Sequence, residues 1–186
     1  SAEVIPVTAR SPAAFDRVHL PFAGAAVLSM GAVIRRNGAP DPGWHARLEG
    51  IAAGAGPRLA AMLAEVAGDA ALRAWIVEEA GLPVYLCVKS NAEDPAEIDA
   101  ALAAVATRLA AMAEGALAVH RNGNNLSAVP EGISKRAAVA HLVAEIGAGR
   151  PVIGIGDSLS DLPFMEMCDM MMVPAGSQIH RRMGGA

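Results

Sequence analysis

The sequence predicts an α/β protein, with a Rossmann-like core around a parallel sheet and an α+β unit inserted into that core. Both ends of the chain alternate short apolar runs with helical patterns, which is typical of βα units. The middle of the chain instead runs helix, strand, strand, helix, strand, strand. We therefore expect residues 1–43 and 129–186 to form the core, and residues 44–128 to form the inserted unit.

The first part of the core is predicted to begin with a short strand over residues 3–7. Ser11 and Pro12 suit the N-cap and the first position of a short helix after it. The Asp41-Pro42-Gly43 stretch indicates a break before the inserted unit. Between these points the pattern predicts a second strand and a small hairpin turning at Asn-Gly, over residues 25–28 and 32–38.

The inserted unit is predicted to hold two helices and four strands. Its first helix covers residues 44–66, with an interruption at Gly54-Ala55-Gly56-Pro57. Apolar residues at steps of four and three predict the buried face of a second helix after Asp94-Pro95: Ile98, Leu102, Val105, Leu109 and Met112. The strands are predicted over residues 72–77, 84–88, 117–120 and 124–128, with turns at Gly81 and Asn122-Gly123.

The second part of the core carries the most informative stretch, Val152-Ile-Gly-Ile-Gly-Asp157-Ser-Leu-Ser-Asp161. Its apolar run predicts a buried strand that ends in glycine, and two acids four residues apart follow. Ligands bind at the carboxyl ends of strands in open α/β sheets. Carboxylates there suit Mg²⁺, which takes oxygen ligands from one or two acids and a substrate phosphate. A last strand over residues 170–173 is expected to close the sheet.

Lys135 opens a helix predicted over residues 135–146, with Ser134 as its N-cap. A cation in the first turn opposes the helix dipole, so local stability gives no reason for it, whereas a phosphate docked nearby does. The alternative is a lysine that lies along the surface with its charge in water. On the sequence alone we expect its replacement to leave folding nearly unchanged.

Thr8 ends the first strand beside the start of a helix, an arrangement that suits an anion and equally fits an ordinary strand end. Arg10 fits a phosphate contact or a solvated surface charge.

Composition excludes several classes of function. The formal net charge is −4 and no Lys/Arg-rich stretch occurs, which argues against a nucleic-acid partner. The longest apolar stretch, residues 22–34, is too short to span a bilayer, and no signal peptide is visible, so we expect a cytoplasmic protein. Cys87 and Cys168 are isolated among apolar residues and are expected to be buried thiols. Nothing in the sequence indicates the oligomeric state.

Two other motifs also match parts of residues 154–159. Gly156-Asp157-Ser158-Leu159 spells the nucleophile block of the GDSL serine esterases, but His180 has Ser177 instead of an acid three positions before it, so a triad cannot be completed downstream. The glycines of Gly154-Ile-Gly156 suggest a dinucleotide loop, yet the third glycine is absent and Asp157 would repel a pyrophosphate.

Three motifs in order resemble the haloacid dehalogenase superfamily of phosphatases. Thr8 after a strand, Lys135 opening a helix, and Gly-Asp157-Ser-x-x-Asp161 after a later strand are similar to its second, third and fourth motifs. The inserted helix-strand-strand unit, twice over, resembles the C2-type cap of its sugar-phosphatase branch, which includes sucrose-phosphatase, mannosyl-phosphoglycerate phosphatase and Cof-like enzymes. The likeness covers nearly the whole chain, from Val4 to about Gly176.

The resemblance implies a role for each matching residue. Thr8, with Ala9 and Arg10 beside it, is expected to bind phosphate, and Lys135 to stabilise the phosphoryl group and the nucleophile. Asp157 is expected to be a Mg²⁺ ligand, Asp161 a second ligand or an outer acceptor, and Ser158 the holder of a metal-bound water. In the cap, the polar candidates for reading the substrate are Arg73, Lys89, Asn91, Asn124 and Asn125, each of which also fits a solvated surface position.

One departure from the family concerns its first motif, Asp-x-Asp-x-Thr, which supplies the aspartate nucleophile and its acid/base partner. No Asp-x-Asp occurs in the 186 residues, and seven residues precede Thr8. Either the nucleophile lies in an N-terminal segment outside this sequence, or the protein is a catalytically silent sugar-phosphate or metal-binding protein. We expect the first, a Mg²⁺-dependent phosphatase of a small sugar phosphate, because losing that central strand would expose unpaired strand edges.

Overall fold

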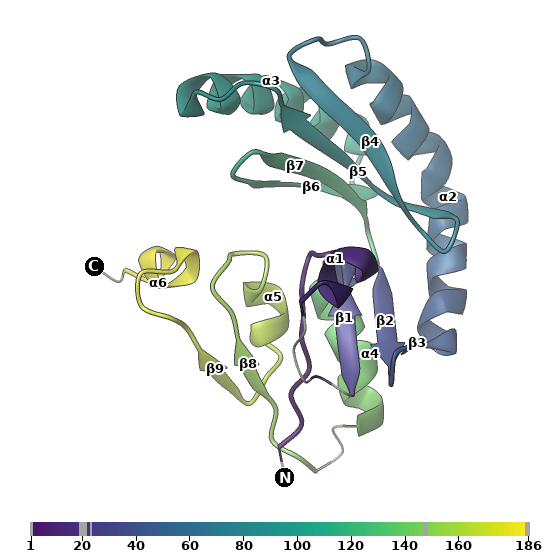
Figure 1. Ribbon diagram of the computed structural model, residues 1–186, viewed down its shortest axis with the longest axis vertical. Helices are drawn as coiled ribbons and strands as arrows, with labels where there is room; N and C mark the ends of the chain where they lie inside the picture. Colours follow the sequence, from purple (N-terminus) through teal and green to yellow (C-terminus); the bar gives the residue numbers. More distant parts are fainter. Residues whose placement is uncertain (1, 19–21, 23, 147–148, 185–186) are drawn as a thin grey trace. The chain divides into compact units, whose positions relative to one another are not determined.

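The computed structural model describes residues 2–18, 22, 24–146 and 149–184 (Figure 1). The chain divides into two compact units, one made of Ser1–His45 and Ser134–Ala186 and the other of Ala46–Ile133. The second unit is continuous in sequence and interrupts the first. The sequence predicts the inserted unit over residues 44–128, and the compact unit in the structure covers residues 46–133.

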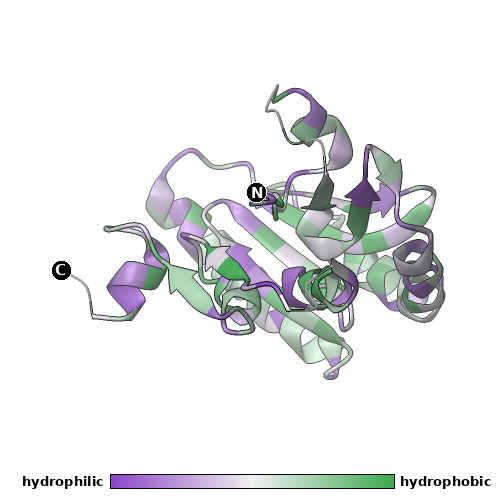
Figure 2. Cartoon of the chain, turned by 90° about the horizontal axis from the view of Figure 1, so that it is seen from below, coloured by the Kyte–Doolittle hydropathy of each residue, from purple (hydrophilic) through white to green (hydrophobic). Residues whose placement is uncertain are grey.

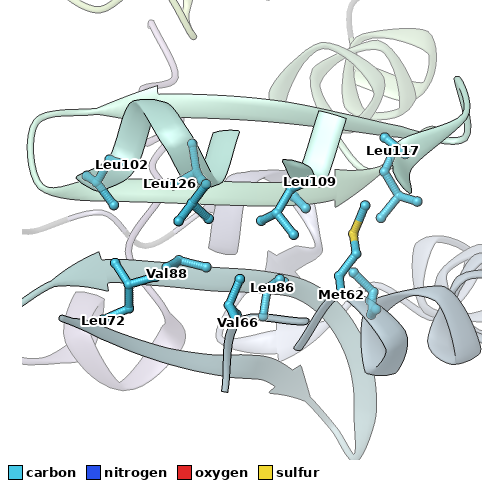
Figure 3. Close-up of a cluster of buried hydrophobic side chains, with 13 residues drawn as sticks. Met62, Val66, Leu72, Leu86, Val88, Leu102, Leu109, Leu117 and Leu126 are labelled. Carbon is cyan, nitrogen blue, oxygen red and sulfur yellow. The ribbon is translucent and has the colours of Figure 1, made fainter. Parts of the chain in front are cut away.

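The second unit is a four-stranded antiparallel sheet with two helices on one face. Its strands are β4 (Leu72–Glu79), β5 (Leu82–Ser90), β6 (Leu117–Asn122) and β7 (Asn125–Pro130), in the spatial order β4-β5-β7-β6. The helices are α2 (Pro42–Val66) and α3 (Pro95–Ala113). Figure 3 shows side chains from both helices and from the sheet pointing toward one another in a single apolar cluster, including Met62, Leu86, Leu109 and Leu126.

Local signals in this unit behave as the sequence predicts. The carboxylate of Asp94 caps α3 by accepting hydrogen bonds from the backbone N–H groups of Ala96 and Glu97. Leu102, Val105 and Leu109 are buried along its inner face, and Ile98 and Met112 pack against the same cluster. The periodicity of this helix is therefore confirmed.

The predicted interruption of α2 at residues 54–57 is wrong. The helix runs unbroken from Pro42 to Val66 with Pro57 inside it. Proline removes one helical hydrogen bond, but Leu59, Met62 and Val66 in the following turns are almost fully buried. Burial of three large side chains offsets the local cost, because each contributes about 1.5–3 kcal/mol.

The first unit is built from a small antiparallel sheet, a separate parallel strand pair and short helices. The sheet is β1 (Ala25–Leu28), β2 (Val33–Arg36) and β3 (Ala39–Pro40), and the pair is β8 (Ile153–Ile155) with β9 (Met170–Met172). At the predicted hairpin, Asn37 and Gly38 have φ values of 51° and 83°, as a two-residue turn of this type requires. The helices are α1 (Pro12–Asp16), the 3-10 turn η1 (Ser29–Gly31), α4 (Lys135–Ile146), α5 (Leu162–Met165) and α6 (Gln178–Arg182).

The expected single parallel sheet is not formed by the described residues. Residues 3–7 make only one parallel bridge, between Val7 and Val27, instead of a regular strand. The β8–β9 pair has no hydrogen-bonded link to β1 in the part of the chain that the structure describes. The strand predicted in residues 152–155 is confirmed as β8, but its burial is not, since Ile153 is 51% and Ile155 63% exposed. Both side chains line the open groove described next.

A groove of about 460 Å³ lies between residues 2–7 and β8. Its lining includes Val139, Leu142 and Val143 of α4, and Phe164 of α5. Figure 2 shows hydrophobic colouring on the strand that precedes the last helix, which is the methionine strand β9. The groove is therefore lined mainly by apolar side chains from the start of the chain, β8, α4 and α5.

Among the described residues, no helix combines the length and the apolar character needed to cross a membrane.

Candidate functional site

The candidate site is centred on an ion pair between Lys135, the first residue of α4, and Asp161, the residue before α5. The Lys135 Nζ atom lies 2.6 Å from Asp161 Oδ1 and donates a second hydrogen bond, of 3.2 Å, to Ser160 Oγ. Lys135 is only 8% exposed and Asp161 6%. The lysine is therefore buried and paired, and the alternative of a solvated surface lysine is wrong.

The other oxygen of Asp161 is also engaged. Its Oδ2 atom accepts hydrogen bonds from the backbone N–H and the hydroxyl of Ser158, both 3.1 Å long. The Ser158 and Ser160 hydroxyl oxygens lie 2.6 Å apart. Because both of its oxygens have partners, Asp161 orients Lys135 and the serine loop, which fits an outer acceptor better than a direct metal ligand.

Two glycines allow the elements of this site to approach closely. A Cβ on Gly156, at the end of β8, would lie 2.6 Å from Asp161 Cβ and 2.6 Å from Met165 Sδ. A Cβ on Gly31 would lie 2.3 Å from the backbone oxygen of Ser134, and Gly31 has a φ of +100°. A side chain at either glycine would therefore displace Asp161 or the start of α4.

The Thr8 loop is held against the same turn. The backbone N–H of Thr8 donates to Val27 O and that of Met30 donates to Thr8 O, at 2.9 and 3.3 Å. The Thr8 hydroxyl oxygen accepts the Arg10 N–H at 3.2 Å, which leaves the hydroxyl proton for another acceptor. Met30 and Gly31 belong to η1, which therefore connects Thr8 to the start of α4. Ala9 and Arg10 are exposed next to Thr8.

Asp157 differs from Asp161 in being exposed. Among the described residues its carboxylate has no hydrogen bond or ion pair, while its backbone oxygen accepts the Ile179 N–H at 3.3 Å. An exposed carboxylate that follows a strand fits Mg²⁺, which usually keeps several waters and takes one or two carboxylates from the protein. The donor set present therefore fits the ion through Asp157, with Asp161 behind it.

The two competing motif interpretations gain no support from the described residues. Ser158 bonds to Asp161 and Ser160, whereas the described ring contact of His180 is with the Gly176 N–H. Gly154 and Gly156 are the places where α5 and Cys168 approach β8. Both cysteines are free, and burial raises the pKa of each thiol.

The five polar candidates of the second unit fall into two groups. Arg73 and Lys89 are paired across β4 and β5, and strand alternation puts them on the sheet face opposite the helices. Asn125 Oδ1 lies 4.0 Å from Cys87 Sγ on that face. The side chain of Asn124 instead bonds to the backbone N–H and oxygen of Ser90, and that of Asn91 to Ala70 O.

The same sheet face carries aromatic groups that sequence reasoning missed. The Arg73 guanidinium lies 5.6 Å from the centre of the Trp75 ring, and burial raises the pKa of Tyr85 to about 12. The strand alternation that puts Arg73 and Lys89 on this face also puts Trp75 and Tyr85 there. In the first unit, Ser160 and Gly31 were missed as well. Ser160 had a signal in its position beside Asp161, but the approach of Gly31 to Ser134 is visible only in three dimensions.

No family model and no curated protein sequence matches the chain. Solved structures do match. Sucrose-phosphatase from Synechocystis, in complex with sucrose and phosphate, is 14% identical with a TM-score of 0.66, covering 97% of this chain and 72% of that one. A trehalose-6-phosphate phosphatase related protein is 18% identical with a TM-score of 0.52, covering 92% and 69%. A haloacid dehalogenase-like hydrolase from Bacteroides thetaiotaomicron is 16% identical with a TM-score of 0.53, covering 91% and 80%. The chain therefore has the fold of the haloacid dehalogenase-type sugar phosphatases.

Proposed function

We propose that this chain is the phosphate- and metal-binding part of a Mg²⁺-dependent phosphatase that hydrolyses a small sugar phosphate through an aspartyl-phosphate. The observation that carries the proposal is the buried Lys135–Asp161 pair beside the exposed Asp157. A buried ion pair is weak evidence for stability, because desolvation of the two charges offsets their attraction. A lysine paired with one carboxylate, with a second, exposed carboxylate four residues before that partner, supplies the two positive charges that phosphoryl transfer needs once a metal is bound.

Each residue has a role in this proposal. Lys135 neutralises charge on the phosphoryl oxygens, and Asp161 with Ser160 holds its ammonium group in place. The Thr8 hydroxyl donates to a phosphate oxygen, with the Arg10 N–H fixing its direction. Asp157 would hold Mg²⁺, with Ser158 positioning a water in its shell. When bound, the ion supplies positive charge that screens the phosphate from an anionic nucleophile.

The nucleophile is proposed to come from a strand outside these 186 residues. Lys135 is committed to Asp161, and no Asp-x-Asp occurs in the sequence. The apolar groove between residues 2–7 and β8 has the lining expected for an added strand. A strand there would pair with β8 and end at the level of Asp157, because the carboxyl ends of parallel neighbours meet at one sheet edge.

The sugar-phosphate class rests on two supports. Two of the similar structures are a sucrose-phosphatase and a trehalose-6-phosphate phosphatase related protein. The sheet face of the second unit opposite its helices carries Arg73, Lys89 and Asn125 together with Trp75. Cationic, amide and aromatic groups on one face suit a polar ring. The free thiols fit a reducing compartment such as the cytoplasm.

A catalytically silent binding protein is the second candidate. It is favoured by one observation, that both oxygens of Asp161 are engaged and Asp157 is the acid left for a metal. Such a protein would bind phosphate and Mg²⁺ without releasing product.

Phosphate release from a panel of sugar phosphates distinguishes the two candidates. We expect the complete gene product to show Mg²⁺-dependent turnover that Lys135→Ala abolishes. The 186 residues alone should bind vanadate without turnover, because none of their site residues is a suitable nucleophile. Binding without turnover by the complete product would favour the silent protein. Turnover by the 186 residues that Ser158→Ala abolishes would restore the esterase interpretation.

A further inference from the structure

A second group of metal-suited side chains lies in the first unit, outside the site described above. Asp41, which precedes α2, meets His141 and Glu145 of α4 across 100 positions of sequence. The Nε2 atom of His141 lies 3.2 Å from Asp41 Oδ1 and 3.6 Å from Glu145 Oε1. All three ligand atoms lie within 4.8 Å of one another. We propose that Asp41, His141 and Glu145 form a zinc-type transition-metal site.

The separations match tetrahedral coordination. Zinc bonds of about 2.0–2.2 Å to nitrogen and oxygen put neighbouring ligand atoms of a tetrahedron about 3.3–3.6 Å apart. The two separations from His141 Nε2 are close to this range. The separation between the two carboxylates has an upper limit of 4.8 Å, and the Glu145 side chain, which is 54% exposed, has room to adjust it. That exposed side also leaves the fourth position to water.

The Arg36 guanidinium binds the second oxygen of each carboxylate, the one that does not face His141. Arg36 Nε bonds to Asp41 Oδ2 at 2.6 Å, and Arg36 Nη2 bonds to Glu145 Oε2. This leaves Asp41 Oδ1 and Glu145 Oε1 facing the imidazole. The Trp44 ring packs on that of His141, with centres 5.4 Å apart, and the backbone N–H of Trp44 donates to Asp41 Oδ1. Partners of this kind orient ligands and tune their affinity in known metal sites.

Charge favours a divalent cation. Two carboxylates and one guanidinium leave one net negative charge around a neutral imidazole. The approach of Nε2 to two carboxylate oxygens is satisfied either by a proton on Nε2, which donates to them, or by a metal ion in the place of that proton. An imidazole ligand also selects zinc-like ions over Mg²⁺, which prefers oxygen ligands alone. The group is thus distinct in chemistry from Asp157.

Cobalt binding tests the site. Metal-free protein is titrated with Co²⁺ in excess Mg²⁺, which occupies oxygen-only sites, while the visible ligand-field bands are recorded. Zn²⁺ is then added to displace the cobalt. We expect one equivalent of Co²⁺ with the intense bands of tetrahedral coordination, lost on adding Zn²⁺. The expected affinity loss in His141→Gln is at least about tenfold, as for metal-site substitutions generally.

The control is His180→Gln, since His180 bonds locally to the Gly176 N–H and should leave both the bands and the affinity unchanged. Melting curves without metal establish that each variant is folded, and Glu145→Gln, at an exposed position, replaces His141→Gln if that variant is not. Equal cobalt affinity in wild type and in the folded variant, or weak bands of octahedral type only, would overturn the proposal and assign the bridging cation to a proton.

Discussion

Breaking the Lys135–Asp161 pair should destabilise the first unit. Lys135→Met removes the ammonium group and leaves Asp161 buried at 6% exposure. An unpaired buried charge costs about 3–5 kcal/mol, while the two hydrogen bonds from Ser158 offset part of it. We expect the free energy of unfolding to fall by about 2–4 kcal/mol.

A double-mutant cycle isolates the pair. Asp161→Asn leaves Lys135 with Ser160 as its neutral partner, so we expect a similar loss. Lys135→Met with Asp161→Asn removes both charges, and the combined loss should fall short of the sum by about 2 kcal/mol. Urea unfolding is followed by the fluorescence of Trp44, which is buried in the first unit, in a Trp75→Phe background. One probe in one unit avoids averaging over two units that unfold separately.

The matched control is Arg136→Met, which removes the next cation of α4 from an exposed position where it bonds to Pro163 O. It should cost under about 1 kcal/mol, as isolated surface contacts do. Losses from Lys135→Met no larger than this control, or strictly additive losses in the cycle, would refute the assignment of a buried, interacting pair.

Three further predictions follow from the same geometry. Gly156→Ala should displace Asp161 and lower both the melting temperature and the vanadate affinity, because a Cβ there meets Asp161 at 2.6 Å. Gly54→Ala, in helix α2 with open space around it, should instead raise the free energy of unfolding in urea by up to about 1 kcal/mol. Equal effects of the two substitutions would contradict the close approach at Gly156. Asp157→Asn should weaken Mg²⁺ binding by at least about tenfold through loss of an anionic ligand, and unchanged affinity by calorimetry would remove Asp157 from the metal site. Burial raises the pKa of Asp41, but hydrogen bonds from Arg36, Trp44 and His141 outweigh it and leave the pKa below the usual 3.8. Asp41 therefore stabilises the fold above that pH, and the stability difference between wild type and Asp41→Asn should shrink as the pH falls below about 4; a difference that stays constant in acid unfolding would be against it.

Much of the fold was predictable because its signals are local. Asn37-Gly38 and Gly81 specify two-residue turns through their positive φ values, and Asp94-Pro95 starts α3 through a side-chain cap. The order of motifs also led to the correct fold class. Such signals predict the structure correctly because each depends on residues only a few positions apart.

Two of the errors concern contacts between distant parts of the chain, and one concerns a local helix start that was misinterpreted. The Pro57 region looked like a break, yet packing of α2 on its sheet keeps it helical. Asp41-Pro42 looked like a linker, although it is the same start signal as Asp94-Pro95. Lys135 was expected to have little effect on folding, whereas its buried pairing with Asp161 now predicts a loss of stability, which the substitutions above test. None of these partners can be read from spacing along the sequence.

The groove and the ion pair together support the proposal that ligand binding and turnover are separable in this protein. Gly31 positions the start of α4, Gly156 positions Asp161, and the ion pair joins the two, so the lysine, the serine loop and Asp157 are held by residues of this chain alone. The outer edge of β8 has no such support, since Ile153 and Ile155 stay exposed beside the groove. A strand added there would supply the nucleophile to a phosphate-binding site that is already formed. Phosphate affinity should therefore depend on Lys135 with or without that strand, whereas product release should require it.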